Sequence, residues 1–175
     1  MPPRLRKTAL VAHVSTSIGW LGAVAAFLAI AVAGLTTTDG DRAHALYLAG
    51  DLVTRTVIVP LAVASCATGL LQSLGTSWGL VRHWWIIAKL VLALPATGLL
   101  LLHTGPIAQL ADPANTTALA AGDLRGMQTQ LLADAAAAIV VLLIATALAV
   151  FKPRGRTVRG HRMALLAGVR PPAQS

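Results

Sequence analysis

Histidine is the residue type in this chain best suited to hold a cofactor. His13, His44, His83 and His103 all lie in or beside long apolar runs. Neutral imidazoles from two membrane helices at one depth are the usual axial ligands of haem iron, and they also bind other metals. The four side chains are therefore candidate haem b or metal ligands.

Depth along the helices limits how these histidines can pair. His83 and His103 stand at opposite ends of one apolar run, about 30 Å apart at 1.5 Å per residue, so they cannot share one iron. The remaining pairs are His13 with His83 at one face of the membrane and His44 with His103 at the other. His13 shares a helical face with Ser17 and Trp20, so it is also a candidate interior polar residue that makes a hydrogen bond between helices.

Ionisable side chains inside apolar runs are the second possible source of chemistry, because a charge at the centre of a membrane helix costs about 2.5–3.5 kcal/mol. Asp51 and Arg55 are four residues apart and so share a helical face, and Asp134 lies one turn inside another run. These residues are interior polar candidates. They form either a polar site or proton relay, or a structural ion pair that fixes helix register. Lys89 has a long side chain that can snorkel to the headgroups.

Four long apolar runs must position these residues. They cover residues 10–35, 52–74, 84–103 and 131–151, and each meets the requirement of about 20 residues for a membrane-spanning helix. The composition agrees, with 56% hydrophobic residues, 11% charged residues and a mean hydropathy of +0.73. The predicted fold is all-α, a polytopic membrane protein with four transmembrane helices in an up-down-up-down antiparallel bundle.

The loops give the orientation and the domain organisation. Lys and Arg gather in the N-terminal segment and after residue 151, and Arg82 lies in the loop at 75–83 on the same side, which places both termini in the cytoplasm of a bacterial plasma membrane. The segments 36–51 and 104–130 are then outer loops, with a short helix expected near 116–124. Residues 1–151 form one transmembrane domain. Residues 152–175 form a basic cytoplasmic tail that is expected to lie on anionic lipid.

Several function classes are disfavoured by what the sequence lacks. The chain contains no Glu, no Gly-rich phosphate loop and no paired cysteines, so it has no recognisable catalytic motif for hydrolysis or nucleotide chemistry. Its net charge of +8 comes from termini and loops rather than from one basic face, which argues against nucleic-acid binding. An enzyme is therefore not the favoured interpretation.

Three segments carry a resemblance to known proteins: residues 13–22 (HVSTSIGWLG), 69–85 (GLLQSLGTSWGLVRHWW) and 152–155 (KPRG). On these segments the chain resembles a family of small, uncharacterised actinobacterial integral membrane proteins. It is more distantly similar to the four-helix bundles of copper-resistance D-type proteins and of cytochrome b561. The resemblance implies a four-span plasma-membrane protein and supplies no substrate or active site.

Two function hypotheses follow from the sequence. The first is a non-enzymatic membrane component, either an accessory subunit or a small binding or permeation bundle, with another membrane protein or a second copy as partner. The alternative is a membrane electron-transfer protein with haem b or a metal held by His ligands.

Overall fold

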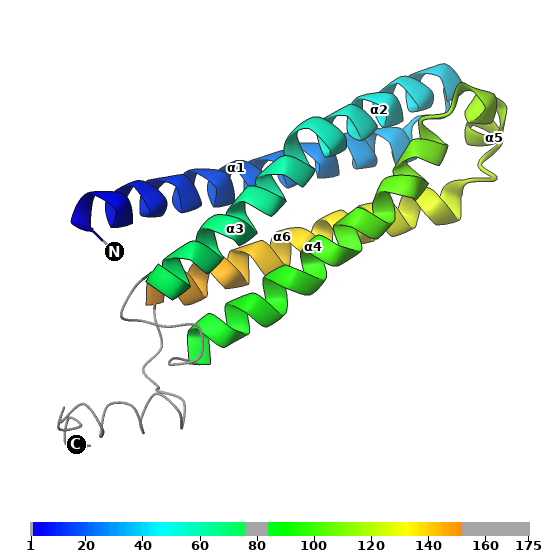
Figure 1. Ribbon diagram of the computed structural model, residues 1–175. Coiled ribbons are helices and arrows are strands. Elements are labelled where there is room, and N and C mark those ends of the chain that lie inside the picture. Colours follow the sequence, from blue (N-terminus) through cyan, green and yellow to red (C-terminus); the bar gives the residue numbers. More distant parts are fainter. Residues whose placement is uncertain (1, 76–83, 152–175) are drawn as a thin grey trace.

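The fold is an all-helical bundle, seen in a computed structural model that describes residues 2–75 and 84–151 (Figure 1). Four helical segments, Arg4–Thr36, Gly40–Leu74, Ile87–Leu110 and Arg125–Phe151, are long and apolar enough to cross a membrane. The predicted all-α fold with four membrane helices is therefore confirmed. The elements in chain order are α1 (Pro3–Thr36), α2 (Gly40–Val53), the π-helical turn η1 (Thr54–Ile58), α3 (Val59–Gly75), α4 (Trp84–Leu110), the 3₁₀ turn η2 (Pro113–Asn115), α5 (Thr116–Ala121) and α6 (Arg125–Phe151).

The segments pack as an antiparallel bundle in which α1 lies against α3, α2 and α6, and α4 lies against α6, α2 and α3. The start of α1 and the end of α6 lie at one end of the bundle, which we call the terminal end (Figure 1). The α1–α2 turn and α5 lie at the other end, which we call the cap end. The predicted tail, residues 152–175, lies outside the described residues.

The first predicted outer loop is mostly helical. Only residues 37–39 separate α1 from α2, whereas the sequence predicted a loop over residues 36–51. Asp39 caps the new helix, because its carboxylate accepts hydrogen bonds from the backbone N–H groups of Asp41 and Arg42. The buried face of α2 then packs on α1: a Cβ added at Gly34 would lie 2.8 Å from Cζ of the buried Tyr47.

The second predicted outer loop is shorter than expected, because α4 continues to Leu110 and α6 begins at Arg125. The predicted short helix is present as α5. It ends at Gly122, whose φ of 82° is a left-handed conformation that glycine adopts without strain. Gly40 packs against α5 so closely that an added Cβ would lie 2.6 Å from the Thr116 carbonyl oxygen. The cap end is thus a tightly packed unit.

A π-helical turn joins α2 to α3 and ends at Ile58, two residues before Pro60. In this turn the Val59 N–H donates to the carbonyl oxygen of Thr54, five residues earlier. The turn keeps α2 and α3 in one continuous span, and it keeps one buried face in line along both helices, from Ala43 and Tyr47 to Ala62 and Ser65.

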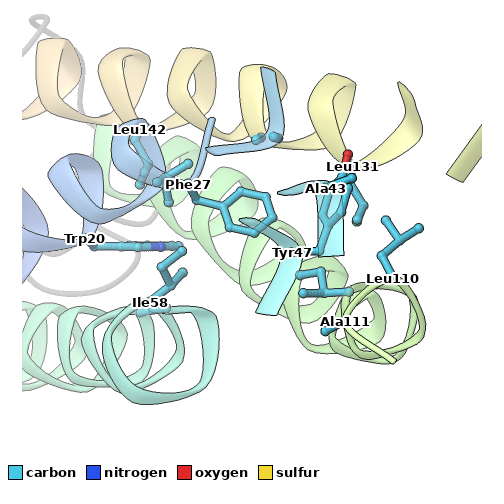
Figure 2. Close-up of a cluster of buried hydrophobic side chains, with 14 of the residues drawn as sticks. Trp20, Phe27, Ala43, Tyr47, Ile58, Leu110, Ala111, Leu131 and Leu142 are labelled. Atoms are coloured by element: carbon cyan, nitrogen blue, oxygen red, sulfur yellow. The ribbon is translucent and has the colours of Figure 1, made fainter. Parts of the chain in front are cut away.

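The hydrophobic core fills the cap end and the middle of the bundle (Figure 2). Trp20, Phe27, Tyr47, Ile58 and Leu142 are among its buried members. Within the described residues, no buried hydrophobic side chain lies closer to the terminal end than Trp20 on α1, Ala62 on α3, Ile107 on α4 and Leu142 on α6. In the third of the bundle nearest the terminal end, the buried side chains described are the serines Ser65 and Ser73.

Candidate functional sites

The depth of each polar residue follows from the helix lengths. The 27-residue helices α4 and α6 are about 40 Å long, which exceeds the hydrocarbon thickness of about 30 Å. Counting about 20 residues from the helix ends at the terminal end places the far edge of the hydrocarbon near Arg55, His103 and Asp134. These three ionisable groups therefore share one level, at the headgroup edge on the cap side.

At this level α4 and α6 are joined by a histidine and an acid. His103 Nε2 lies 3.0 Å from Asp134 Oδ2, and the two side chains are 16% and 31% exposed. Gln130, one turn before Asp134 on α6, brings its amide nitrogen to 3.2 Å from the same His103 Nε2. We call these three residues the α4–α6 cluster.

Hydrogen bonding fixes the tautomer of His103. Its Nδ1 lies 2.9 Å from the carbonyl oxygen of Leu99, which can only accept, so Nδ1 carries a hydrogen. Nε2 lies 3.2 Å from the Gln130 amide nitrogen and 3.0 Å from Asp134 Oδ2. On a neutral ring Nε2 accepts a hydrogen bond from Gln130, and on a protonated ring it forms an ion pair with Asp134.

Asp51 and Arg55 form the ion pair that their four-residue spacing predicts. The Arg55 Nε donates to both carboxylate oxygens at 2.9 Å. The Arg55 side chain is 53% exposed, so this pair lies on the outer surface of the bundle. Asp134 makes its ionic contact with His103 of α4, so the three predicted residues belong to two separate pairs.

A second polar region, which we call the α1–α3 seam, lies in the third of the bundle nearest the terminal end. His13 Nδ1 donates to the Ser65 carbonyl at 3.1 Å and lies 3.2 Å from the Thr68 hydroxyl. Ser17 and Ser65 share a hydroxyl hydrogen bond of 2.8 Å, and the Gln72 amide donates to the Ala9 carbonyl at 2.8 Å. Polar contacts thus join the two helices over about two turns.

Small residues allow this approach of the two helices. An added Cβ at Gly69 would lie 3.0 Å from Cε1 of His13, and one at Gly19 would lie 3.2 Å from a methyl carbon of Leu61. Small residues at such positions let the backbones of two membrane helices approach closely. His13, predicted as an interior polar residue, therefore makes the hydrogen bonds between helices that were one of its two interpretations.

Lys89 of α4 lies in the same third of the bundle as His13, so a third helix adds a basic side chain at this end. All six acidic residues of the chain lie at or beyond the level of Asp134 on the cap side. The terminal third of the described bundle consequently has basic ionisable groups and no carboxylate.

The candidate haem ligands can be tested against this geometry. His44 donates from Nε2 to the Ala111 carbonyl at 2.9 Å, and both ring nitrogens of His103 face protein atoms. An axial ligand needs a nitrogen lone pair aimed at the iron, and both nitrogens of His103 face protein atoms, so His103 does not fit an axial ligand in this arrangement. His83, the proposed partner of His13, lies outside the described residues. No three His, Cys or Asp side chains converge within the part of the chain that the structure describes.

Sequence reasoning missed several residues of both sites. Gln130 was assigned to an outer loop, and Thr68 and Gln72 carried no signal beyond being polar in an apolar run. The spacing of Ser65, Thr68 and Gln72 at three and four residues places them on one helical face. A similar polar face on α1 contains Ala9, His13 and Ser17. The two polar faces together could have predicted that α1 and α3 pack through the seam.

Comparison with known proteins gives no relative: no protein-family model, no curated protein and no solved structure matches this chain.

Proposed function

We propose that this protein is a non-enzymatic component of the bacterial plasma membrane that binds an anionic ligand at its terminal end. The termini face the cytoplasm in this proposal, because Lys and Arg gather in the segments at that end. The bundle acts as a binding or accessory protein. The packed core at Trp20, Phe27 and Tyr47 argues against an open pore through its centre.

The observation that carries the proposal is that Lys89 of α4 and His13 of α1 lie in the same third of the bundle, where the chain has no Asp or Glu side chain. Ionisable residues inside membrane spans are costly, and they commonly mark ligand or ion sites. His13 is held against α3, because its Nδ1 hydrogen is donated to the Ser65 carbonyl and lies near the Thr68 hydroxyl. Lys89 therefore supplies the cationic group for the ligand.

A phosphate group suits this position. It is carried by anionic lipids of the cytoplasmic leaflet, which also attract basic segments such as residues 152–175. Each basic residue near the membrane surface adds about 1 kcal/mol to such attraction, or about a fivefold change in affinity. The same chemistry would be offered by a soluble phosphate compound, so the test must distinguish these two sources.

The test uses the full chain in nanodiscs of phosphatidylcholine with and without phosphatidylglycerol, with retained lipid counted by native mass spectrometry. We expect wild type to retain phosphatidylglycerol and Lys89→Gln to retain about fivefold less. Arg42→Gln, at the cap end, is the matched control and should behave as wild type.

Equal retention by Lys89→Gln and wild type would reject the lipid ligand. A second arm adds soluble inorganic phosphate to phosphatidylcholine nanodiscs. If phosphate raises the unfolding temperature of the protein in these nanodiscs, and phosphatidylglycerol is not retained, the ligand is a soluble anion. Absence of both effects would reject the proposed function.

The electron-transfer alternative depends on His13 with His83. An absorption spectrum of protein purified from haem-replete cells decides it, because a bound haem gives a Soret band. We expect no such band.

A further inference from the structure

The α4–α6 cluster places one imidazole nitrogen between two different partners on the neighbouring helix. His103 Nε2 lies 3.2 Å from the amide nitrogen of Gln130 and 3.0 Å from Oδ2 of Asp134. Gln130 and Asp134 are one turn apart on α6, so they approach this nitrogen from one helical face. We infer that Nε2 binds a proton reversibly, and that this proton decides whether Gln130 or Asp134 holds α4 to α6.

The carbonyl group of Leu99 determines which ring nitrogen titrates. Its oxygen lies 2.9 Å from His103 Nδ1 and can only accept a hydrogen bond, so Nδ1 keeps its hydrogen whether the ring is neutral or charged. The proton that comes and goes is therefore the one on Nε2, which faces α6. Protonation of this ring consequently acts directly on the contact between the two helices.

In the neutral state Nε2 has a lone pair and can only accept a hydrogen bond. The amide group of Gln130 donates to it, whereas a carboxylate has no hydrogen to offer. Asp134 Oδ2 is accordingly buried without a hydrogen-bond donor in the part of the chain that the structure describes. This oxygen costs free energy, because no donor replaces the water that it has lost.

In the protonated state Nε2 is a donor, and the roles of the two partners reverse. Asp134 Oδ2 gains the donor that it lacks, and the amide nitrogen of Gln130 loses its acceptor. The proton also removes the net negative charge of the His103 and Asp134 pair, which is costly at the edge of the hydrocarbon. A hydrogen bond between two ions is roughly twice as strong as one between neutral groups. The contact is therefore tighter with the proton bound, and this gain is lost as pH rises through the range in which imidazole titrates.

The other ionisable groups around the ring leave Asp134 as its ionic partner. α4 packs against α6, α2 and α3, and the ionisable side chain of α3 is Cys66. Asp51 and Arg55, at the level of the ring, pair with each other. Lys89 lies about 20 Å away along α4. The remaining ionisable groups of α2 and α6 lie nearer the cap end: Asp41, Arg42, His44, Tyr47 and Arg125.

Water reaches this site, because the His103 and Asp134 side chains are 16% and 31% exposed at the headgroup edge. The strength of the α4–α6 contact thus follows the pH of the water on the cap side. With the orientation proposed above this is the outside of the cell, and only that assignment of side rests on the proposed function. The proton site itself is separate from the seam and is tested without reference to orientation.

Double-mutant cycles at pH 5 and pH 8, the two limits of the imidazole range, test the exchange of partners. The full chain is unfolded reversibly in mixed micelles, with His103→Phe combined with either Asp134→Ala or Gln130→Ala. At pH 5 the coupling of His103 to Asp134 should change the unfolding equilibrium constant by about threefold or more, and its coupling to Gln130 should vanish. At pH 8 the order should reverse. The control cycle, with Asp51→Ala, should show no coupling at either pH.

A measurement on the wild-type chain guards against variants that fail to fold. Nitrogen-15 NMR of histidine-labelled protein in nanodiscs reads the protonation of each ring nitrogen. His103 should keep the Nδ1 hydrogen at both pH values and carry a hydrogen on Nε2 at pH 5 only. The inference is overturned by an Nε2 that does not change between pH 5 and pH 8, or by a hydrogen that leaves Nδ1. Coupling of His103 to Asp134 that is absent, or equal at the two pH values, also overturns it.

Discussion

Replacing Gly34 with alanine tests the packing of α1 on α2 at the cap end. An added Cβ would lie 2.8 Å from Cζ and 2.9 Å from both Cε2 and the hydroxyl oxygen of Tyr47. Non-bonded carbon atoms pack at about 3.5–4.0 Å, so the ring or the helix would have to move by about 0.7 Å. Tyr47 is only 1% exposed, which leaves its ring no open side.

The expected cost is that of overpacking a closely packed core, about 1–3 kcal/mol. Gly22→Ala, on the same helix, is the matched control, because a Cβ there meets nothing within 4 Å. Alanine in place of glycine favours a helix by about 0.5–1 kcal/mol, so this control should be as stable as wild type or more so. The two variants differ in the neighbours of the new methyl group, and Gly34→Ala should be the less stable by about 1–3 kcal/mol.

Reversible unfolding in mixed micelles, followed by Trp fluorescence, measures this difference. A double-mutant cycle attributes it to the contact: when Tyr47→Leu has removed the ring, Gly34→Ala should lose most of its penalty. If Gly34→Ala is as stable as Gly22→Ala, or if its penalty persists in the Tyr47→Leu background, the described packing of α1 on α2 is incorrect.

Three further predictions concern the seam, the cap and the orientation. Gln72→Leu removes an amide hydrogen bond from α3 to α1 and should destabilise the bundle by about 0.6–1.7 kcal/mol in the same unfolding assay; unchanged stability would contradict it. Gly40→Ala puts a Cβ 2.6 Å from the Thr116 carbonyl oxygen and should raise hydrogen exchange across α5, whereas Gly126→Ala, with nothing within 4 Å, should leave exchange as in wild type. A cysteine at Ser175 should react with a membrane-impermeant maleimide after the cells are opened, and labelling of intact cells would reverse the proposed topology.

The four helices were predictable because length and hydropathy alone decide whether a segment can span a bilayer. The residues at which these helices begin and end were less predictable. The segment 40–50 contains Asp41, Arg42 and His44 and therefore scores as polar, yet its Ala43 and Tyr47 face is buried. Hydropathy averaged over all sides of a helix misses such one-sided burial. The span at residues 52–74 was accordingly assigned without the helix that extends it.

Of the two ionic pairs, one could be predicted from local spacing in the sequence and the other could not. The Asp51 and Arg55 pair is local, since residues four apart on a helix are neighbours. The pairing of His103 with Asp134 depends on the register of α4 against α6. That register is set by the turns and the short helix between them, whose path the sequence does not specify.

The π-helical turn at Thr54–Ile58 has a consequence for insertions and deletions in this protein. Buried residues recur once per turn from Ala43 to Ser73, so this face contains eight turns over 30 residues. Eight turns of a regular α-helix need only about 29 residues. The wide turn therefore stores the equivalent of one inserted residue. Deleting the exposed Val57 would return the segment to regular α-helix with its buried stripe still in line. Deleting one residue near the start of α3 would instead rotate every following side chain by about 100°, carrying the serines of the seam away from α1.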